Sequence, residues 1–515
     1  MLTLLNDTIN RLYPFYSSAC LAGAALVSIF FGLSDRKGIK VFLIFLSVCS
    51  IFASLFFNIF SFLKSGSFSD FLFVFDKLQV VEISIILFSA INILLLFSIY
   101  NFRKQSFSKI LIIFQVAVFL ITIFILSNNL IMIFCSLALA VAGIFQLVTL
   151  LAGQSDIRTE SEYLVKNQII RFFMVASFSL IVLFTGFSLI FGVLDFKTFV
   201  QIVQSDKLEN PLLRTGLFII FTGIFTYLFI FPLQSAYIKL IKRTEGISAL
   251  IIWFFYYPAG IFLFLKLFDI FATFTGKNIF LNAALYFIAL VCIAGGNIGA
   301  VKTTSLRRIM SFLFLATLGF SILSLAFFST RLIESAAVLR LIIANTVFLI
   351  FIYFPVYSIF LEIERQKGSD SIENIRGFAR NNKYSGIILI LILLSFAGLA
   401  GTSGYIVKII FIQPFIDILK AQTAGWTGSS FIILNYTGSI AAIAGWIFFA
   451  ANIIRMLIYM VRSPGKAGKI LVPKFYHIYI LFFCLILIYT GIAGLMELTG
   501  STSILTGIPV FSFNF

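Results

Sequence analysis

The sequence has very few of the residues from which proteins build metal and redox sites. Its one histidine, His477, lies beside Tyr476 and Tyr479 at the start of the last apolar segment, where an interfacial aromatic belt is the simpler interpretation. No haem or zinc site can be built from it. The cysteines lie singly in distant apolar segments without paired spacing, which indicates neither a disulfide framework nor an iron–sulfur site. They are Cys20, Cys49, Cys135, Cys292 and Cys484.

Charged residues are also scarce, at 11% of the chain, whereas hydrophobic residues make up 61% and the mean hydropathy is +1.10. No water-soluble domain of 515 residues could carry that composition on its surface. About fourteen apolar segments are long enough to cross a bilayer as helices, and they lack strand alternation. The predicted fold class is therefore an all-α polytopic membrane protein with about 14 transmembrane helices.

Acidic residues are outnumbered, because 20 Asp and Glu stand against 37 Lys and Arg, for a formal net charge of +17. In a soluble protein this balance would suggest nucleic acid, but here the positive residues lie in short loops between apolar segments. The loops after odd-numbered segments hold 24 of them, and the loops after even-numbered segments hold 8. The positive-inside rule then predicts that the odd loops face the cytoplasm and that both termini lie outside.

Two apolar segments are interrupted by residues that break helices. Segment 12 contains Gly398, Gly401 and Gly404 among small hydroxyl residues, and segment 7 is interrupted at 229–235, around Pro232. Such breaks free backbone groups at membrane depth, which persist only where they line a cavity or polar pathway. A lone proline often kinks a membrane helix without any role. Two breaks five spans apart, an odd offset, nevertheless favour a pair of inverted five-helix repeats.

This pattern predicts four parts. They are an N-terminal three-helix segment at 1–105, a first repeat of spans 4–8 at 106–275, a second repeat of spans 9–13 at 276–462, and a C-terminal helix and tail at 463–515. No polar loop has room for a soluble catalytic domain, and neither a Walker loop nor a dinucleotide fingerprint occurs. Any nucleotide or redox chemistry is therefore expected in partner subunits.

Four cations lie inside the predicted spans and are candidates for a proton relay, because exposure to lipid would cost several kcal/mol each. Lys408 follows the break in segment 12 by about one turn and is the strongest, since a buried lysine can lose its charge. The others have structural alternatives. Lys266 could pair with Asp269, Arg340 could reach the interface, and Arg455 could belong to a cytoplasmic anchor.

Acidic groups at depth are few, and Glu82 in segment 3 is the most isolated of them. It could pair across a subunit boundary. The alternative that we favour slightly places it at the headgroup level beside Asp76 and Lys77.

Several motifs resemble the antiporter-like membrane subunits of respiratory NADH:quinone oxidoreductase (complex I), most closely the N-type or chain 2 homologue, over about residues 70–470. The run SFAGLAGTSGYIVK at 395–408 resembles the broken-helix motif SLAGIP…GF..K, whose lysine maps onto Lys408. The runs GN at 296–297, TSLRRIMSF at 304–312 and LGF at 318–320 resemble GN…TNLKRLLAYSS and LGY. Glu245 and Gly246, after Pro232, resemble the end of VPFH.W.PD.YEGAP.

The departures from the family concern its ionisable residues. The resemblance implies a glutamate in span 5 and lysines in spans 7 and 8. These positions are held by Ala138, by Tyr227 and by the stretch from Tyr257 to Gly260. A relay needs groups whose charge can switch. The first half-channel is therefore expected to be degenerate, unless tyrosines and ordered water substitute.

The resemblance implies a membrane-arm subunit of a bacterial NADH:quinone oxidoreductase, in the cytoplasmic membrane, that takes part in proton translocation coupled to quinone reduction. It implies no catalytic, cofactor or metal site in this chain. NADH, flavin, iron–sulfur clusters and quinone are expected in partner subunits, and nucleic acid is not an expected partner. The alternatives are a non-pumping structural subunit of such a complex, a cation/proton antiporter, or a membrane hydrogenase subunit. The loss at Ala138 argues against an autonomous exchanger.

Overall fold

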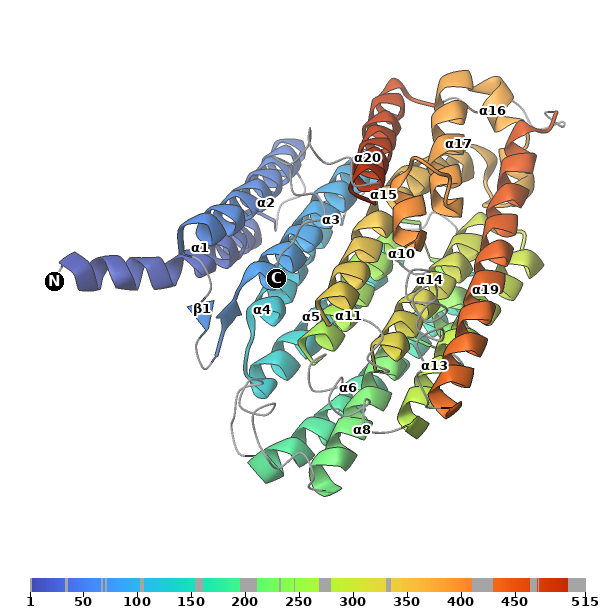
Figure 1. The fold of residues 1–515 in the computed structure, drawn as a ribbon. Coiled ribbons are helices and arrows are strands. Elements are labelled where there is room, and N and C mark those ends of the chain that lie inside the picture. Colours follow the sequence, from blue (N-terminus) through green and yellow to red (C-terminus); the bar gives the residue numbers. More distant parts are fainter. Residues whose placement is uncertain are drawn as a thin grey trace. The chain divides into compact units, whose positions relative to one another are not determined.

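The structure is a computed structural model, and nearly all of the residues that it describes are helical (Figure 1). The described residues are 2–32, 36–65, 68–69, 72–101, 106–152, 161–194, 211–230, 233–244, 246–267, 279–329, 335–409, 429–463, 470 and 472–498. Helices dominate because a chain in hydrocarbon must pair its backbone groups within each segment. The chain divides into two compact units.

Unit 1 comprises Met1–Phe229 and Ser235–Phe271. A short antiparallel ribbon of β1 (Phe68–Ser69) and β2 (Val74–Phe75) precedes its third helix. The π-helix η2 (Ile252–Tyr256) lies directly before the last helix. The α-helices of unit 1 are α1 (Leu2–Phe31), α2 (Lys37–Ser65), α3 (Lys77–Asn101), α4 (Phe107–Leu126), α5 (Leu130–Ala152), α6 (Ser161–Leu194), α8 (Pro211–Tyr227), α9 (Gln234–Arg243), α10 (Gly246–Ile251) and α11 (Tyr257–Lys266).

Unit 2 comprises Ile230–Gln234 and Ala272–Phe515. Its first two long helices, α13 and α14, pack along each other, and α19 packs against both (Figure 1). The helices of unit 2 are α13 (Ile279–Lys302), α14 (Leu306–Ser329), α15 (Ser335–Lys367), the 3-10 turn η3 (Ile372–Ile375), α16 (Phe378–Asn381), α17 (Lys383–Ala397), α19 (Ser429–Val461) and α20 (Lys474–Leu498). Residues 403–409 form a further helical segment.

The predicted all-α polytopic class is confirmed. Within the described part of the chain, eleven helices are long and apolar enough to cross a membrane. Three shorter apolar helices, Phe15–Phe31, Pro211–Tyr227 and Lys383–Ala397, stand where segments 1, 7 and 12 were expected. The second and third of these end at the predicted breaks, which shorten them.

The break in segment 7 begins at the start of the predicted stretch, 229–235. Pro232, on which that prediction rested, lies outside the described residues. Helix α8 ends at Tyr227, and Phe229 has a φ of +49°, a left-handed conformation that is rare for a side chain of this size. The amide of Phe229 donates to the Thr226 carbonyl at 3.1 Å, which tightens the last turn. The interruption is therefore built into the backbone before the proline is reached.

A polar clasp ties the start of α14 to the loop after α15. Arg307 binds Glu364 at 2.8 Å and Asp370 at 3.4 Å, and the Ser305 hydroxyl donates to Asp370. The Leu306 amide donates to the Asp370 carbonyl at 2.7 Å. An arginine suits this place because its planar fork can bind two carboxylates at once and keeps its charge. The clasp fixes one end of the helices that line the site described next.

Candidate functional site

The break in segment 12 is a glycine-terminated helix end followed by a fresh helix start. Gly398 ends α17 with a φ of +99°, and Gly401 has a φ of +86°. Both conformations favour glycine because it has no Cβ. The amides of Gly398 and Leu399 both donate to the Leu394 carbonyl, at 3.0 and 2.9 Å, which closes the helix end. Gly404 has no such φ, but a Cβ there would collide with the Ser395 carbonyl.

Lys408 turns back from the new helix toward the end of α17. Its ammonium donates to the Phe396 carbonyl at 2.5 Å. The same nitrogen lies 5.3 Å from the ring centre of Trp446 and 4.8 Å from that of Phe449, both within cation–π range. Trp446 in turn donates its indole N–H to the Ala397 carbonyl at 3.1 Å. Two carbonyls at the end of α17 are thus taken by the lysine and by the tryptophan beside it.

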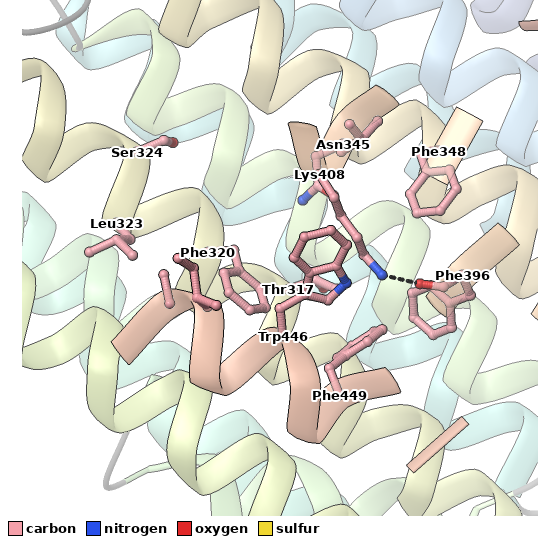
Figure 2. Close-up of a pocket in the computed structure, with 13 residues that line it drawn as sticks. Thr317, Phe320, Leu323, Ser324, Asn345, Phe348, Phe396, Lys408, Trp446 and Phe449 are labelled. Carbon is pink, nitrogen blue, oxygen red and sulfur yellow. Dashed lines mark hydrogen bonds between the residues drawn. The ribbon is translucent and has the colours of Figure 1, made fainter. Parts of the chain in front are cut away.

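The ammonium borders a cavity of about 40 Å³ between α14, α15, α19 and the broken segment (Figure 2). By the usual volume of a water molecule, about 30 Å³, this is room for about one molecule. Figure 2 shows the Lys408 side chain running toward the Phe396 carbonyl, with the rings of Trp446 and Phe449 beside it. The lining is Thr317, Phe320, Leu323, Ser324, Asn345, Phe348, Phe396, Val407, Lys408, Ala442, Ile443, Trp446 and Phe449.

No carboxylate belongs to this lining, so the described residues around the cavity offer the ammonium only a carbonyl and ring faces. The polar groups that do reach it are Thr317, Ser324 and Asn345, and Asn345 donates to the Ser321 hydroxyl at 3.0 Å. None of these neighbours carries a charge that would bind the amine permanently in its protonated form. Chemically, the site can hold and release a proton.

The other predicted relay cations are not brought to this cavity among the residues that the structure describes. Arg455 donates to the carbonyls of Val301, Ala300 and Thr303, at 2.5, 2.9 and 3.1 Å, and so caps the end of α13. Lys266 lies in unit 1, at the last position of α11. Arg340 lies in the first turns of α15, and its side chain is outside the described residues.

Two of the three lost family positions in unit 1 lie together. Tyr227 is fully buried and stacks on Tyr256, with ring centres 4.3 Å apart and planes 4° apart. A Cβ on Gly260 would lie 2.7 Å from the Tyr227 ring, so the tyrosine occupies the space beside that glycine. Ala138 is half-buried on α5. The positions expected to correspond to the family's span-7 and span-8 lysines thus lie among packed aromatic rings.

The backbone is also irregular at this place. The π-helix η2 directly precedes Pro258, which has no N–H to donate to the preceding turn. Single π turns of this kind are frequent at functional sites. Sequence reasoning missed η2, although the Tyr257–Pro258 pair is a visible signal for an irregular turn.

Sequence reasoning also missed the aromatic partners of Lys408. Trp446 and Phe449 are three residues apart on α19, the spacing that places side chains on one helix face, but nothing in the chain links that face to segment 12. Asn345 was likewise missed. The described residues contain no group of three or more His, Cys, Asp or Glu side chains that could hold a metal ion.

Comparisons with known proteins identify the family to which the chain belongs. Residues 127–434, more than half of the chain, match the family model described as NADH:quinone oxidoreductase/Mrp antiporter, TM. The subunit N of NADH-quinone oxidoreductase from Geobacillus kaustophilus is 22% identical over 175 residues, which are 34% of this chain and 32% of the relative. The protein of the same name from Geotalea uraniireducens is 27% identical over 128 residues, 25% of this chain and 26% of the relative. These matches thus span about a third and a quarter of the curated relatives.

Solved structures share the fold at low identity. The chain superposes on a chain of respiratory complex I from Thermus thermophilus with a TM-score of 0.68 and 14% identity, covering 93% of this chain and 98% of that one. An archaeal membrane-bound sulfane sulfur reductase gives a TM-score of 0.76 and 14% identity over 94% and 95% of the two chains. The Mrp complex from Dietzia sp. gives 0.75 and 12% over 95% and 96%.

Proposed function

Because the chain belongs to the NADH:quinone oxidoreductase/Mrp antiporter transmembrane family, we propose that it is a subunit of a membrane complex that moves protons across the bilayer, with Lys408 as the proton-exchanging group. The observation that carries this proposal is the position of Lys408. Its ammonium is held at a helix break by one carbonyl and two rings, beside a cavity with room for water. A lysine so placed costs free energy that function can explain.

The proposed complex couples proton movement to quinone reduction. Sequence similarity to two proteins named subunit N of NADH-quinone oxidoreductase supports this choice. NADH, flavin, iron–sulfur clusters and quinone would then bind in other subunits. We place the chain in a bacterial cytoplasmic membrane with both termini outside, as the distribution of Lys and Arg suggests.

We further propose that the transport unit of this chain is its second half. The expected parts are 1–105, 106–275, 276–462 and 463–515, with spans 4–8 and 9–13 as inverted repeats. The packing of Tyr227 against Tyr256 and Gly260 supports a first half-channel that no longer relays protons by the route of its family. The Lys408 cavity supports an intact relay in the other repeat.

The test is Lys408→Met in the assembled complex. Removing a proton-transfer group typically lowers the rate about 100-fold. We expect the protons moved through this subunit to fall to background, so the ratio of protons to reduced quinone should drop while the complex still assembles. The measurement is proton uptake in sealed vesicles together with quinone reduction. Lys383→Met, at the exposed start of α17, is the matched control and should change neither. An unchanged ratio in Lys408→Met would remove the proposed role.

A non-pumping structural subunit is the second candidate. The packed aromatic rings at Tyr227 and Tyr256 favour it, because they replace ionisable groups by fixed bulk. A cation/proton antiporter and a membrane hydrogenase subunit are further alternatives, and the fold shared with the Mrp complex fits the first of these. A Lys408→Met variant that affects neither pumping nor assembly would favour the structural subunit.

A further inference from the structure

Glu82 is a buried acid that the proposed function leaves unused. It lies in the second turn of α3, its side chain is 0% exposed, and neither carboxylate oxygen has a hydrogen-bond partner among the described residues. Buried polar groups are almost always hydrogen-bonded, and a buried carboxylate without such bonds is costly. The sequence had placed this residue at the headgroup level. Its complete burial inside unit 1 asks for another explanation.

The cation that acts on Glu82 does not form a hydrogen bond with its carboxylate. Lys266, at the last position of α11, interacts electrostatically with Glu82, as does the carboxylate of Asp76. The Lys266 ammonium, however, donates its hydrogen bond to the Ser127 carbonyl at 2.8 Å. Ser127 follows the last residue of α4. A structural ion pair would bring the ammonium onto the carboxylate, whereas here the cation is bonded to backbone and the acid remains open to accept a proton.

A row of polar side chains connects Glu82 with the start of its helix. Asp76, Gln79 and Glu82 are spaced by three residues, which places them on one side of α3. Asp76 is half-buried and accepts from the amides of Leu78 and Gln79, at 2.8 and 3.3 Å. Its own amide donates to the Gln79 side chain at 3.2 Å. Exposure falls along the row, since Gln79 and Glu82 are buried. The row therefore leads inward from the helix end.

We propose that Glu82 is a proton-binding site of unit 1, which exchanges protons with the adjoining solution past Asp76 and Gln79. In each exchange, a hydronium ion delivers a proton to the carboxylate, one O–H bond forms on Glu82 and a water molecule is released. The reverse step returns the proton. Asp76 and Lys266 are the charged groups that act on Glu82 among the described residues. Lys77 is exposed, and Asp269 lies outside the described residues.

A role of Glu82 in transport rests on the proposed function, whereas proton binding by Glu82 does not. The family positions at Ala138, Tyr227 and Gly260 have no ionisable group in the carboxylate or ammonium range. Glu82 and Lys266 would give unit 1 a charge pair at one end of its helices instead. With the loops oriented as proposed, that end is the outer face of the membrane. The site would then release or accept protons there.

The test is an infrared pH titration of the purified full chain, with whatever subunits accompany it. A buried protonated carboxyl gives a distinct C=O band that shifts in heavy water. We expect Glu82→Gln to remove one such band. Glu373→Gln, an exposed acid on η3, should leave that band unchanged. Lys266→Met should enlarge the protonated band in the pH range where Glu82 is partly ionised, because a neighbouring cation favours the ionised form.

Identical titrations of wild type and Glu82→Gln would overturn the proposal. If Glu82→Gln does not accumulate, Glu82→Asp keeps the carboxyl and must shift the band frequency, and an unshifted band is equally contrary. Lys408→Met separates the two proposals, because it should abolish transport and keep the Glu82 band. A Glu82 band in a chain that moves no protons would leave the site standing and remove the proposed function.

Discussion

At the scale of single residues, Arg307 and Arg455 have a different role from Lys408. Arg307 binds two carboxylates and Arg455 binds three carbonyls, so each fixes a helix end. Lys408 has one hydrogen bond and two ring contacts. An arginine stays charged under all ordinary conditions, whereas a lysine can release its proton. Sequence reasoning identified Lys408 from its place after a break, but it could not separate the arginines, because their partners lie more than fifty residues away.

Tyr227→Phe tests whether the first half-channel conducts through its tyrosines. The Tyr227 hydroxyl is buried and without a hydrogen-bond partner among the described residues, so removing it should stabilise the protein by up to about 1–3 kcal/mol and leave proton translocation unchanged. The measurements are thermal unfolding and the ratio of translocated protons to reduced quinone. Tyr353→Phe is the matched control, since its hydroxyl donates to the Met310 carbonyl at 2.7 Å and its loss should destabilise. A coupling defect in Tyr227→Phe would show that this half still carries protons.

Gly260→Ala is not a suitable second test of whether the first half-channel conducts. From sequence alone the substitution looks harmless, because the position merely lacks the family lysine. In the structure, a Cβ there would lie 2.7 Å from both the Leu228 side chain and the Tyr227 ring. We therefore expect a loss of about 1–3 kcal/mol from overpacking, whatever the position does in transport. Unfolding temperature measured beside the proton ratio separates the two effects.

At the scale of elements, hydropathy predicted the helices well and their irregularities in part. Long apolar segments must become helices in lipid, so their existence follows from composition alone. Gly398 and Gly401 predicted the break in segment 12, where both have positive φ. In segment 7 the break predicted at 229–235 rested on Pro232, and the described backbone turns at Phe229, the first residue of that stretch. Tertiary packing, including a stack of Phe229 on Phe172 at 4.7 Å, supports that turn.

Gly404→Ala tests how tightly the broken segment is closed. The added methyl would meet the Ser395 carbonyl, so the new helix would have to move away from α17. We expect a loss of about 1–3 kcal/mol and a lower rate of proton translocation, because Lys408 is one turn further along. Gly295→Ala on α13 is the control, since nothing lies within 4 Å of a Cβ there. Equal unfolding temperatures for the two variants would contradict the close approach at Gly404.

At the scale of the whole molecule, the sequence determined the class of protein more firmly than its activity. Low charge and high hydropathy predicted the polytopic fold, and motifs near segments 7, 9, 10 and 12 predicted the family, which the match over residues 127–434 confirms. The proposed activity would depend on partner subunits. The solved structures that share the fold come from complex I, a sulfane sulfur reductase and an Mrp complex, so one architecture serves several assemblies.

Purification from native membranes decides among these assemblies. A tagged chain extracted in mild detergent should carry flavin and iron–sulfur subunits and reduce quinone. This outcome follows from the proposed function, in which flavin and iron–sulfur clusters bind in other subunits. Subunit identification by mass spectrometry and a quinone reduction assay are the measurements. If the chain purifies without redox subunits and exchanges cations for protons in vesicles, it belongs with the antiporters instead.

The end of α17 has a consequence for how charge and shape are connected. The carbonyls of Phe396 and Ala397 lie where the helix stops, and they are held by Lys408 and Trp446. A neutral amine donates a weaker hydrogen bond than an ammonium. Each discharge of Lys408 would therefore unlatch the last turn of α17, and each recharge would latch it again. In the proposed function, the protonation state of Lys408 would thus be coupled to the conformation of the end of α17.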